Sequence, residues 1–299
     1  MADAPASHSR PLDGAAMALV VLLCSIWGFN QVAIKLALTD IPPLIQCTAR
    51  TALATLIVLV VMRWRGLPIA ARDGTLWPGL VAGALFGLEF ILIYRGLLYT
   101  TASRAVIFIY LAPFFVVIGG RLFLPADRFG PLQWAGLAMS FAGMLIAFGV
   151  PAPSAGPSQM LGDVMMIGAA LAWAATTLVI KASSLARVSP EKTLLYQLVV
   201  CVPMAGLAAM AFGETVAAMP SALAFGSIVY QTLVVSLTFA AWFALIVKFS
   251  ASRLSAFTFL TPLCGVAAGH LVLGEPLTVS FALAVALVAA GLVLVNRPK

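Results

Sequence analysis

Glu89 is the only acidic residue deep within any of the long apolar segments of this chain. An ionisable group at such a position costs several kcal/mol unless it faces water, a ligand or a partner of opposite charge. Its carboxylate could bind the ammonium group of a substrate or carry a proton that couples a reaction to a proton gradient. The alternative is an internal ion pair or hydrogen bond, for which Lys35, Arg50 and Arg95 are candidates.

Aromatic and hydroxyl side chains recur at helical spacing in the same apolar segments. Such residues could stack on an aromatic or aliphatic ligand, although they also anchor helices at membrane interfaces or pack helices together. Asn30 is a further candidate, because a buried amide in lipid needs a partner and often lies where a bundle is wet. Together with Glu89 and Asn30, the predicted binding residues are Trp27, Tyr94, Tyr110, Trp173, Thr177, Tyr230, Phe239 and Trp242.

The residue types that metal or nucleophilic chemistry requires are scarce. His8 and His270 are the two histidines, and the four cysteines lie singly in apolar runs without a C-x-x-C pair. We therefore expect no metal site and no cofactor. The chain has no H-E-x-x-H, no G-x-S-x-G and no paired intramembrane aspartates, so we do not expect an enzyme. An intramembrane enzyme that uses Glu89 stays as the alternative from another functional class.

The composition indicates that helices in a bilayer position these side chains. Of the 299 residues, 63% are hydrophobic and 9% are charged, whereas soluble domains carry about 25% charged residues. A water-soluble fold could not bury this much apolar surface, so lipid is the expected solvent. Polar, proline and glycine breaks predict ten helical spans, at residues 15–38, 43–62, 76–98, 105–124, 131–149, 161–185, 193–212, 222–247, 254–273 and 277–295.

The net charge of +7 comes from basic residues that stand singly between the apolar runs. This pattern argues against a nucleic-acid partner and is typical of membrane topology, in which cytoplasmic loops are enriched in Lys and Arg. Nearly all basic residues fall on one side, and the opposite side has Arg104, with Arg95 and Lys35 nearby. Both termini, including a leader at residues 1–14, are therefore predicted to be cytoplasmic. Lys35 and Lys181 stand near span ends, from which their side chains could reach the interface.

The two halves of the chain resemble each other at a nearly constant offset of 146 to 149 residues. Collinear matches of this kind indicate a duplicated five-helix unit at residues 15–149 and 161–296, joined by an extracytoplasmic linker at 150–160. Since five is odd, the two copies must point in opposite directions. The matches are Trp27 and Lys35 with Trp173 and Lys181, Ala102-Ser103-Arg104 with Ala251-Ser252-Arg253, Leu111-x-Pro113 with Leu260-x-Pro262, Gly120 with Gly269, and Ala142-Gly143 with Ala290-Gly291.

The ten-span layout, the W-G-x-N segment that starts at Trp27, and the A-S-R, L-x-P and G arrangement resemble the EamA family of the drug/metabolite transporter superfamily. Within it, the chain is most similar to bacterial amino-acid exporters of the YddG type. The resemblance covers essentially the whole chain. It implies a basket-like bundle in the inner membrane, in which the third, fourth, eighth and ninth spans line a central cavity with the first and sixth.

These observations predict an all-α membrane protein that moves small organic solutes by alternating access, because inverted repeats can exchange conformations around a site near the bilayer midplane. Pro113 and Pro262 fall in the centres of the fourth and ninth spans, where a freed carbonyl could serve binding or gating or simply kink the helix. The resemblance implies aromatic and other amino acids as substrates, and Glu89 is the residue that could couple their export to protons. Drugs or other metabolites, including organic cations, are the alternative, and a channel, receptor or scaffold is less favoured.

Overall fold

The protein is described from a computed structural model that covers residues 12–69, 72–124, 127–153, 156–274 and 277–297. Most of the leader predicted at residues 1–14 therefore lies outside the described residues. Within those ranges the chain is helical and contains no strand. The elements are α1 (Gly14–Ala37), α2 (Pro43–Trp64), α3 (Leu76–Gly96), α4 (Ala102–Ile109), α5 (Ala112–Phe123), α6 (Pro131–Phe148), α7 (Pro157–Ala182), the 3₁₀ helix η1 (Ser184–Arg187), α8 (Pro190–Ala211), α9 (Ala222–Lys248), α10 (Ala251–Phe257), α11 (Leu260–Leu273) and α12 (Val279–Asn296).

Ten helices among the described residues are long and apolar enough to cross a membrane, which confirms the predicted all-helical class. Their ends differ from the predicted ones by a few residues, because local caps rather than hydropathy decide where a helix starts. The fourth span begins at Ala102 instead of residue 105, since the Thr101 side chain accepts a hydrogen bond from the Arg104 backbone. An N-cap of this type can extend a helix beyond its apolar core.

The fourth and ninth spans are each interrupted near the middle. In the fourth, α4 ends at Ile109 and α5 starts at Ala112, with Pro113 in the first turn of α5. In the ninth, α10 ends at Phe257 and α11 starts at Leu260, with Pro262 as its third residue. A proline is tolerated in a first turn, where its missing N–H has no helical partner. Two helices therefore restart inside the bundle at corresponding positions of the two halves.

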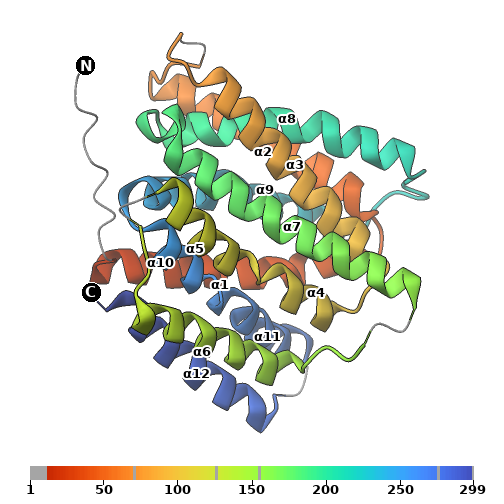
Figure 1. The fold of residues 1–299 in the computed structure, drawn as a ribbon. Coiled ribbons are helices and arrows are strands. Elements are labelled where there is room, and N and C mark those ends of the chain that lie inside the picture. The colour runs from red at the N-terminus through yellow and green to blue at the C-terminus, as the bar shows by residue number, and fades with distance from the viewer. Residues whose placement is uncertain (1–11, 70–71, 125–126, 154–155, 275–276, 298–299) are drawn as a thin grey trace.

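The helices of the two halves interleave in one bundle (Figure 1). α6 and α12 lie side by side along one edge, and α2, α3 and α8 pack together at the opposite edge. The interfaces between the halves occur in corresponding pairs. The third span packs on the sixth (α3 with α7) as the eighth packs on the first (α9 with α1). The first span packs on the ninth (α1 with α11) as the sixth packs on the fourth (α7 with α4 and α5). Each half therefore completes its packing with helices of the other.

The interface between α6 and α12 depends on close backbone contact at two glycines. A Cβ atom on Gly136 would lie 2.5 Å from the carbonyl oxygen of Gly291, and one on Gly291 would lie 2.3 Å from Ser140 Oγ. Without side chains at these points, the two helices come close enough for extensive van der Waals contact, the main attraction between helices in lipid.

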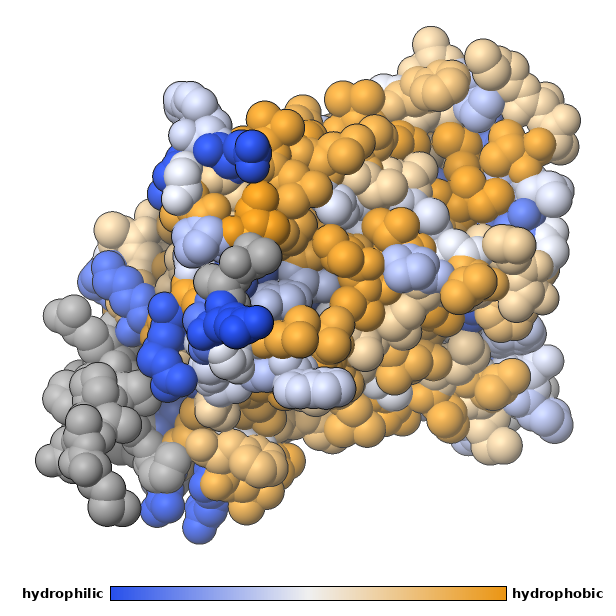
Figure 2. All heavy atoms as spheres, turned by 90° about the horizontal axis from the view of Figure 1, so that it is seen from above, coloured by the Kyte–Doolittle hydropathy of each residue, from blue (hydrophilic) through white to orange (hydrophobic). Residues whose placement is uncertain are grey.

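Both ends of the described chain lie on the same side of the bundle. The Leu12 backbone N–H donates to Asn296 Oδ1 at 3.2 Å, and Asn296 Nδ2 donates to the Leu12 carbonyl at 3.1 Å. We call this the terminus side, defined by the start of α1 and the end of α12. Hydrophilic side chains gather on the left of Figure 2, where Figure 1 also shows both chain ends, whereas apolar residues cover much of the remaining face.

Candidate functional site

Glu89 lies on a face of α3 that is turned into the bundle. It shares this face with Phe86, three residues before it, and Ala82, seven residues before it, both of which are buried. The lipid-facing stripe of α3 contains Val81 and Leu88 instead. Glu89 itself is half-buried. No Lys or Arg nitrogen lies within 4.0 Å of its carboxylate among the described residues.

Arg50 of α2 is the basic residue whose charge acts on Glu89. Its positive charge acts on the Glu89 carboxylate across the interior, although the pair is not in contact. The guanidinium lies 4.5 Å from the centroid of the Phe90 ring and 5.7 Å from that of Tyr94, distances typical of cation–π contacts. Of the three partners that the sequence allowed for Glu89, the structure therefore favours Arg50.

Aromatic rings from α1, α3 and α9 form one cluster beside this polar region. The Trp27 ring centroid lies 5.6 Å from that of Phe239 and 5.3 Å from that of Trp242. Phe86 connects the cluster to α3, because its ring lies 5.7 Å from that of Phe239. Trp27 Nε1 donates to Thr238 Oγ1 at 2.8 Å, which satisfies the indole N–H inside the bundle.

A second aromatic cluster surrounds the two helix breaks. Tyr110 stands directly before Leu111 at the α4–α5 break, and Phe259 holds the corresponding place before Leu260 at the α10–α11 break. Their ring centroids are 6.1 Å apart, and Trp173 of α7 lies 5.9 Å from Tyr110. Tyr110 is also close enough to Glu89 for an electrostatic interaction between the tyrosine hydroxyl and the carboxylate. The two breaks therefore meet, and they meet near Glu89.

Several buried polar atoms in the bundle have no protein hydrogen-bond partner. Among them are Asn30 Oδ1 on α1, Arg50 Nε on α2, the Tyr94 hydroxyl on α3, both amide atoms of Gln197 on α8 and Thr261 Oγ1 on α11. A buried polar atom without a partner costs about 1–3 kcal/mol. Atoms of this kind in a membrane bundle are expected to meet water or a polar ligand.

Not all the predicted residues join this region. Tyr230 packs its ring 5.3 Å from that of Phe29, which is 39% exposed, and donates its hydroxyl to the Ile26 carbonyl. Its contacts are those of helix packing. Thr177 is buried on α7 without a ring contact or hydrogen bond among the described residues. Of the ten predicted binding residues, these two have the weakest structural support.

The structure corrects the expectation for Lys181. Instead of reaching the membrane interface, its side chain is buried and Nζ donates to the carbonyls of Ile246, at 2.7 Å, Val247 and Phe249. These carbonyls belong to the last turn of α9 and to its C-cap residue Phe249, where the helix leaves them without helical partners and carries partial negative charge. Lys181 therefore caps the end of α9.

Several residues of the polar and aromatic region were not predicted as binding residues, among them Arg50, Phe86 and Phe259. The sequence did carry one signal, because Arg50 stands eight residues into an apolar span rather than in a loop. For Phe86 and Phe259, the sequence offers no feature that separates them from other buried aromatics.

An ion pair joins the two halves on the side opposite the termini. Arg104 NH2 lies 2.5 Å from Asp163 Oδ2, and Thr100 Oγ1 donates to Asp163 Oδ1 at 2.6 Å. The pair lies at the polar edge of a cavity of about 700 Å³ between α4, α6 and α7, with Phe108 and Phe141 among its apolar walls. Since Arg104 and Asp163 belong to different five-span units, relative movement of the units at this side must disturb the pair.

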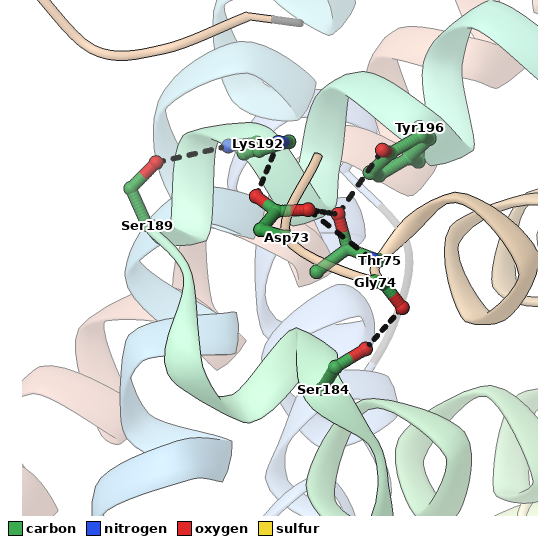
Figure 3. A network of polar contacts seen from close by, with 7 residues as sticks. All are labelled: Asp73, Gly74, Thr75, Ser184, Ser189, Lys192 and Tyr196. Carbon is green, nitrogen blue, oxygen red and sulfur yellow. Dashed lines mark hydrogen bonds and ion pairs between the residues drawn. The ribbon is translucent and has the colours of Figure 1, made fainter. Parts of the chain in front are cut away.

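A second network joins the halves on the terminus side (Figure 3). Lys192 Nζ of α8 lies 2.6 Å from Asp73 Oδ2 in the α2–α3 connection, and Thr75 Oγ1 donates to Asp73 Oδ1 at 2.6 Å. Tyr196 shares a 3.1 Å hydrogen bond with Thr75, and Ser184 donates to the Gly74 carbonyl at 2.8 Å. The hydrogen bond from Lys192, followed by that from Thr75, lowers the pKa of Asp73 to about 2.

We expect Asp73→Asn to lower the melting temperature at pH 7, because the nearly fully buried Lys192 ammonium would lose its carboxylate. A carboxyl whose pKa is depressed by folding stabilises the fold above its unfolded pKa, near 3.9, and loses this effect as the pH falls through the folded pKa. Thermal melts of the purified protein should therefore show a gap between wild type and variant that is constant from pH 5 to 7 and shrinks from pH 4 downward. An equal melting temperature at pH 7 would contradict the prediction.

Comparison with known proteins identifies the protein family of this chain. The EamA-like transporter family matches the chain twice, at residues 14–149 and 160–297, which is nearly its whole length. The chain belongs to the EamA-like transporter family. Each match covers one set of five spans, so each half of this EamA protein is by itself similar to the family unit.

Several relatives align with nearly the full length of this EamA chain, among them two bacterial transporters. The uncharacterized transporter YvbV of Bacillus subtilis (strain 168) is 27% identical over 93% of this chain and 90% of its own. The uncharacterized inner membrane transporter YedA of Escherichia coli (strain K12) is 25% identical over 97% of this chain and 92% of its own. A solved crystal structure shares the fold with a TM-score of 0.79 at 20% identity, covering 94% of this chain and 96% of the other.

A third relative, whose transported solute is known from its name, aligns with only part of the chain. The riboflavin transporter of Rhizobium johnstonii is 33% identical over 114 residues, which are 38% of this chain and 35% of that protein. The family and the full-length relatives support an integral inner membrane transporter of small solutes. They do not show similarity to exporters of amino acids.

Proposed function

We propose that this EamA protein exports small organic solutes, chiefly aromatic and other amino acids, across the bacterial inner membrane. In this proposal it is a carrier and not an enzyme. The solute would bind inside the bundle between Glu89 and the two aromatic clusters, with its ammonium group at Glu89 and its side chain against rings such as Trp27, Tyr110 and Trp173.

The observation that carries this proposal is the setting of Glu89. It is an inward-facing carboxylate without an ion pair among the described residues, and it lies close to Arg50 and to the point where the two broken helices meet. Discontinuous helices and intramembrane charges are features of solute sites in secondary transporters. The Tyr94 hydroxyl, on the ring that lies 5.7 Å from Arg50, and Asn30 Oδ1 on α1 are buried without partners and would supply further polar contacts to the solute.

Alternating access would follow from the two five-span units, which we propose are inverted repeats at residues 15–149 and 161–296, joined by a linker at 150–160. The paired interfaces of the two halves and the two family matches support this arrangement. The Arg104–Asp163 pair would open when the site faces outward, and the Asp73–Lys192 network when it faces inward. Pro113 and Pro262 would set the position of the breaks about which the broken spans move.

The terminus side is proposed to be cytoplasmic. Its connections hold most of the basic residues, as the positive-inside rule requires, and the opposite side holds Arg104 and the ends of helices near Lys35 and Arg95. Coupling of export to proton entry through Glu89 is part of the proposal, because a carboxylate at this depth can change its protonation with the side to which the site opens.

An exporter of drugs or other metabolites is the second candidate, since a carboxylate among aromatic rings also suits an organic cation. The similarity of a part of the chain to a riboflavin transporter favours a flat aromatic solute of either class. The two candidates differ in whether the solute carries a negative group.

The first test is counterflow in proteoliposomes that contain the purified protein. Radiolabelled aromatic, aliphatic and charged amino acids would be followed against liposomes without protein. We expect saturable exchange that is fastest for aromatic amino acids. If a folded protein exchanged none of them, amino-acid export would be wrong and drug or metabolite export would take its place.

A further inference from the structure

Arg50 is a cation buried in the membrane bundle, and among the described residues no carboxylate is in contact with it. Only 2% of its surface is exposed, and no carboxylate oxygen lies within 4.0 Å of the guanidinium among the described residues. Its Nε has no hydrogen-bond partner. A buried charge without a partner is strongly unfavourable, so a group that is not part of this fold is expected to compensate it.

The position of Arg50 excludes the usual compensation by lipid headgroups. It is the eighth residue of α2 (Pro43–Trp64), about 10 Å along the helix axis from the start at 1.5 Å per residue. A lysine or arginine that reaches the interface exposes its polar end, whereas the Arg50 side chain is covered by protein. The thiols of Cys47 and Cys201 are its other polar neighbours, and neither supplies the two oxygen acceptors of a carboxylate.

Two aromatic rings of α3 lie close to the Arg50 guanidinium. Phe90 and Tyr94 lie 4.5 Å and 5.7 Å from it, measured to the ring centroids. A guanidinium that contacts aromatic faces can still offer two parallel N–H donors at its edge, the geometry that binds a carboxylate with both oxygens. Tyr94 contributes a hydroxyl that also has no partner.

Glu89 stands at the same depth as Arg50. It precedes the end of α3 (Leu76–Gly96) by seven residues, again about 10 Å along the axis, and the start of α2 and the end of α3 both lie on the side opposite the termini. The two charges attract each other without contact. A negative and a positive site separated in this way match a molecule that carries both charges.

We propose that Arg50 binds the carboxylate of the transported solute while Glu89 binds its cationic group. The inference rests on the proposed solute transport and deepens it, because it makes a negative group on the solute a requirement. A purely cationic drug would then meet an unbalanced Arg50, and a neutral solute would leave both charges without partners. When the site is empty, Arg50 and Glu89 partly compensate each other.

The test compares each carboxylate solute with the same solute whose carboxylate is replaced. Counterflow in proteoliposomes would be inhibited with phenylalanine and leucine and with their amides, phenylalaninamide and leucinamide. In the wild type we expect the amides to inhibit at least about tenfold more weakly, as the loss of charged hydrogen bonds predicts. In Arg50→Gln we expect this preference to disappear, because both forms would bind weakly.

Arg95→Gln is the matched control. Arg95 is also an arginine stacked on an aromatic ring, 3.7 Å from the Phe212 centroid, but it lies at the end of α3 and donates to Tyr99. We expect it to keep the full preference for the carboxylate forms. If a thermal melt showed that Arg50→Gln is not folded, Arg50→Lys would replace it. We expect this variant to lose part of the preference for the carboxylate forms, because the charge stays but the two parallel N–H donors are lost.

The outcomes separate this inference from the proposed function. Exchange in the wild type with an undiminished carboxylate preference in a folded Arg50 variant would overturn the role of Arg50 and leave transport intact. Wild-type exchange of the amides as fast as the amino acids would also overturn it. No exchange of any of the four compounds by the folded wild type would instead overturn amino-acid transport itself.

Discussion

Glu89→Gln is expected to lower amino-acid export by at least about tenfold, with the protein still folded. The substitution keeps the size of the side chain and removes its negative charge. A hydrogen bond to a charged group contributes about 1.5–3 kcal/mol, and the proposed ammonium contact would lose most of this. The variant should fold because no Lys or Arg nitrogen lies within 4.0 Å of the Glu89 carboxylate among the described residues, so that Arg50 loses only a longer-range attraction.

The measurement is export of radiolabelled phenylalanine from preloaded proteoliposomes at several external pH values. Glu191→Gln serves as the control, since Glu191 pairs with Arg65 at the terminus side and lies far from the site in the fold. The wild type and the control should respond to pH, and Glu89→Gln should not. Export at the wild-type rate with unchanged pH dependence in Glu89→Gln would exclude a functional role for this carboxylate.

Gly291→Ala is expected to destabilise the protein strongly, because it places a methyl group where the backbones of α6 and α12 touch. The new Cβ would lie 2.3 Å from Ser140 Oγ and 2.5 Å from the Gly136 carbonyl oxygen, and a backbone carbonyl cannot move away without shifting its helix. Overpacking of this kind typically costs about 1–3 kcal/mol. The effect should appear as a lower melting temperature in detergent, with a loss of transport that follows the loss of folded protein.

Gly226→Ala is the matched control, because a Cβ atom at Gly226 of α9 would meet no atom within 4 Å. Alanine is a better helix former than glycine by about 0.5–1 kcal/mol, so this variant should melt at the same or a higher temperature. If both variants melted like the wild type, the α6–α12 contact would not have the importance that its geometry indicates.

The fold class and the number of spans could be predicted from the sequence alone. Apolar runs of membrane length leave helices as the solution in lipid, because each backbone group must find its partner within its own segment. The internal matches also predicted which positions of the two halves correspond, and Pro113 and Pro262 marked the two spans that the structure shows to be broken. These features depend on local hydropathy and on identities along the chain, and both are visible without coordinates.

The candidate site was predicted only in part. Glu89, Trp27 and Tyr110 stood out because a charge or an aromatic residue in an apolar run is visible in the sequence, and the structure places each of them inside the bundle. The sequence did not show that Tyr230 packs against exposed Phe29, or that Lys181 turns inward to cap α9. Hydropathy gives the depth of a side chain along a span but not the face of the helix on which it lies relative to its neighbours.

The sequence by itself therefore determined that this is a ten-span helical protein with a duplicated plan and one deep carboxylate. Only the tertiary structure decided that Arg50 of α2 lies near enough to Glu89 of α3 for their charges to attract, that Tyr110 and Phe259 bring the two breaks together, and that Asp73 meets Lys192 across the two halves. The physical reason is that these contacts join residues from different helices. Their distances depend on how the helices rotate and cross, which close packing at points such as Gly136 and Gly291 sets once the whole chain is assembled.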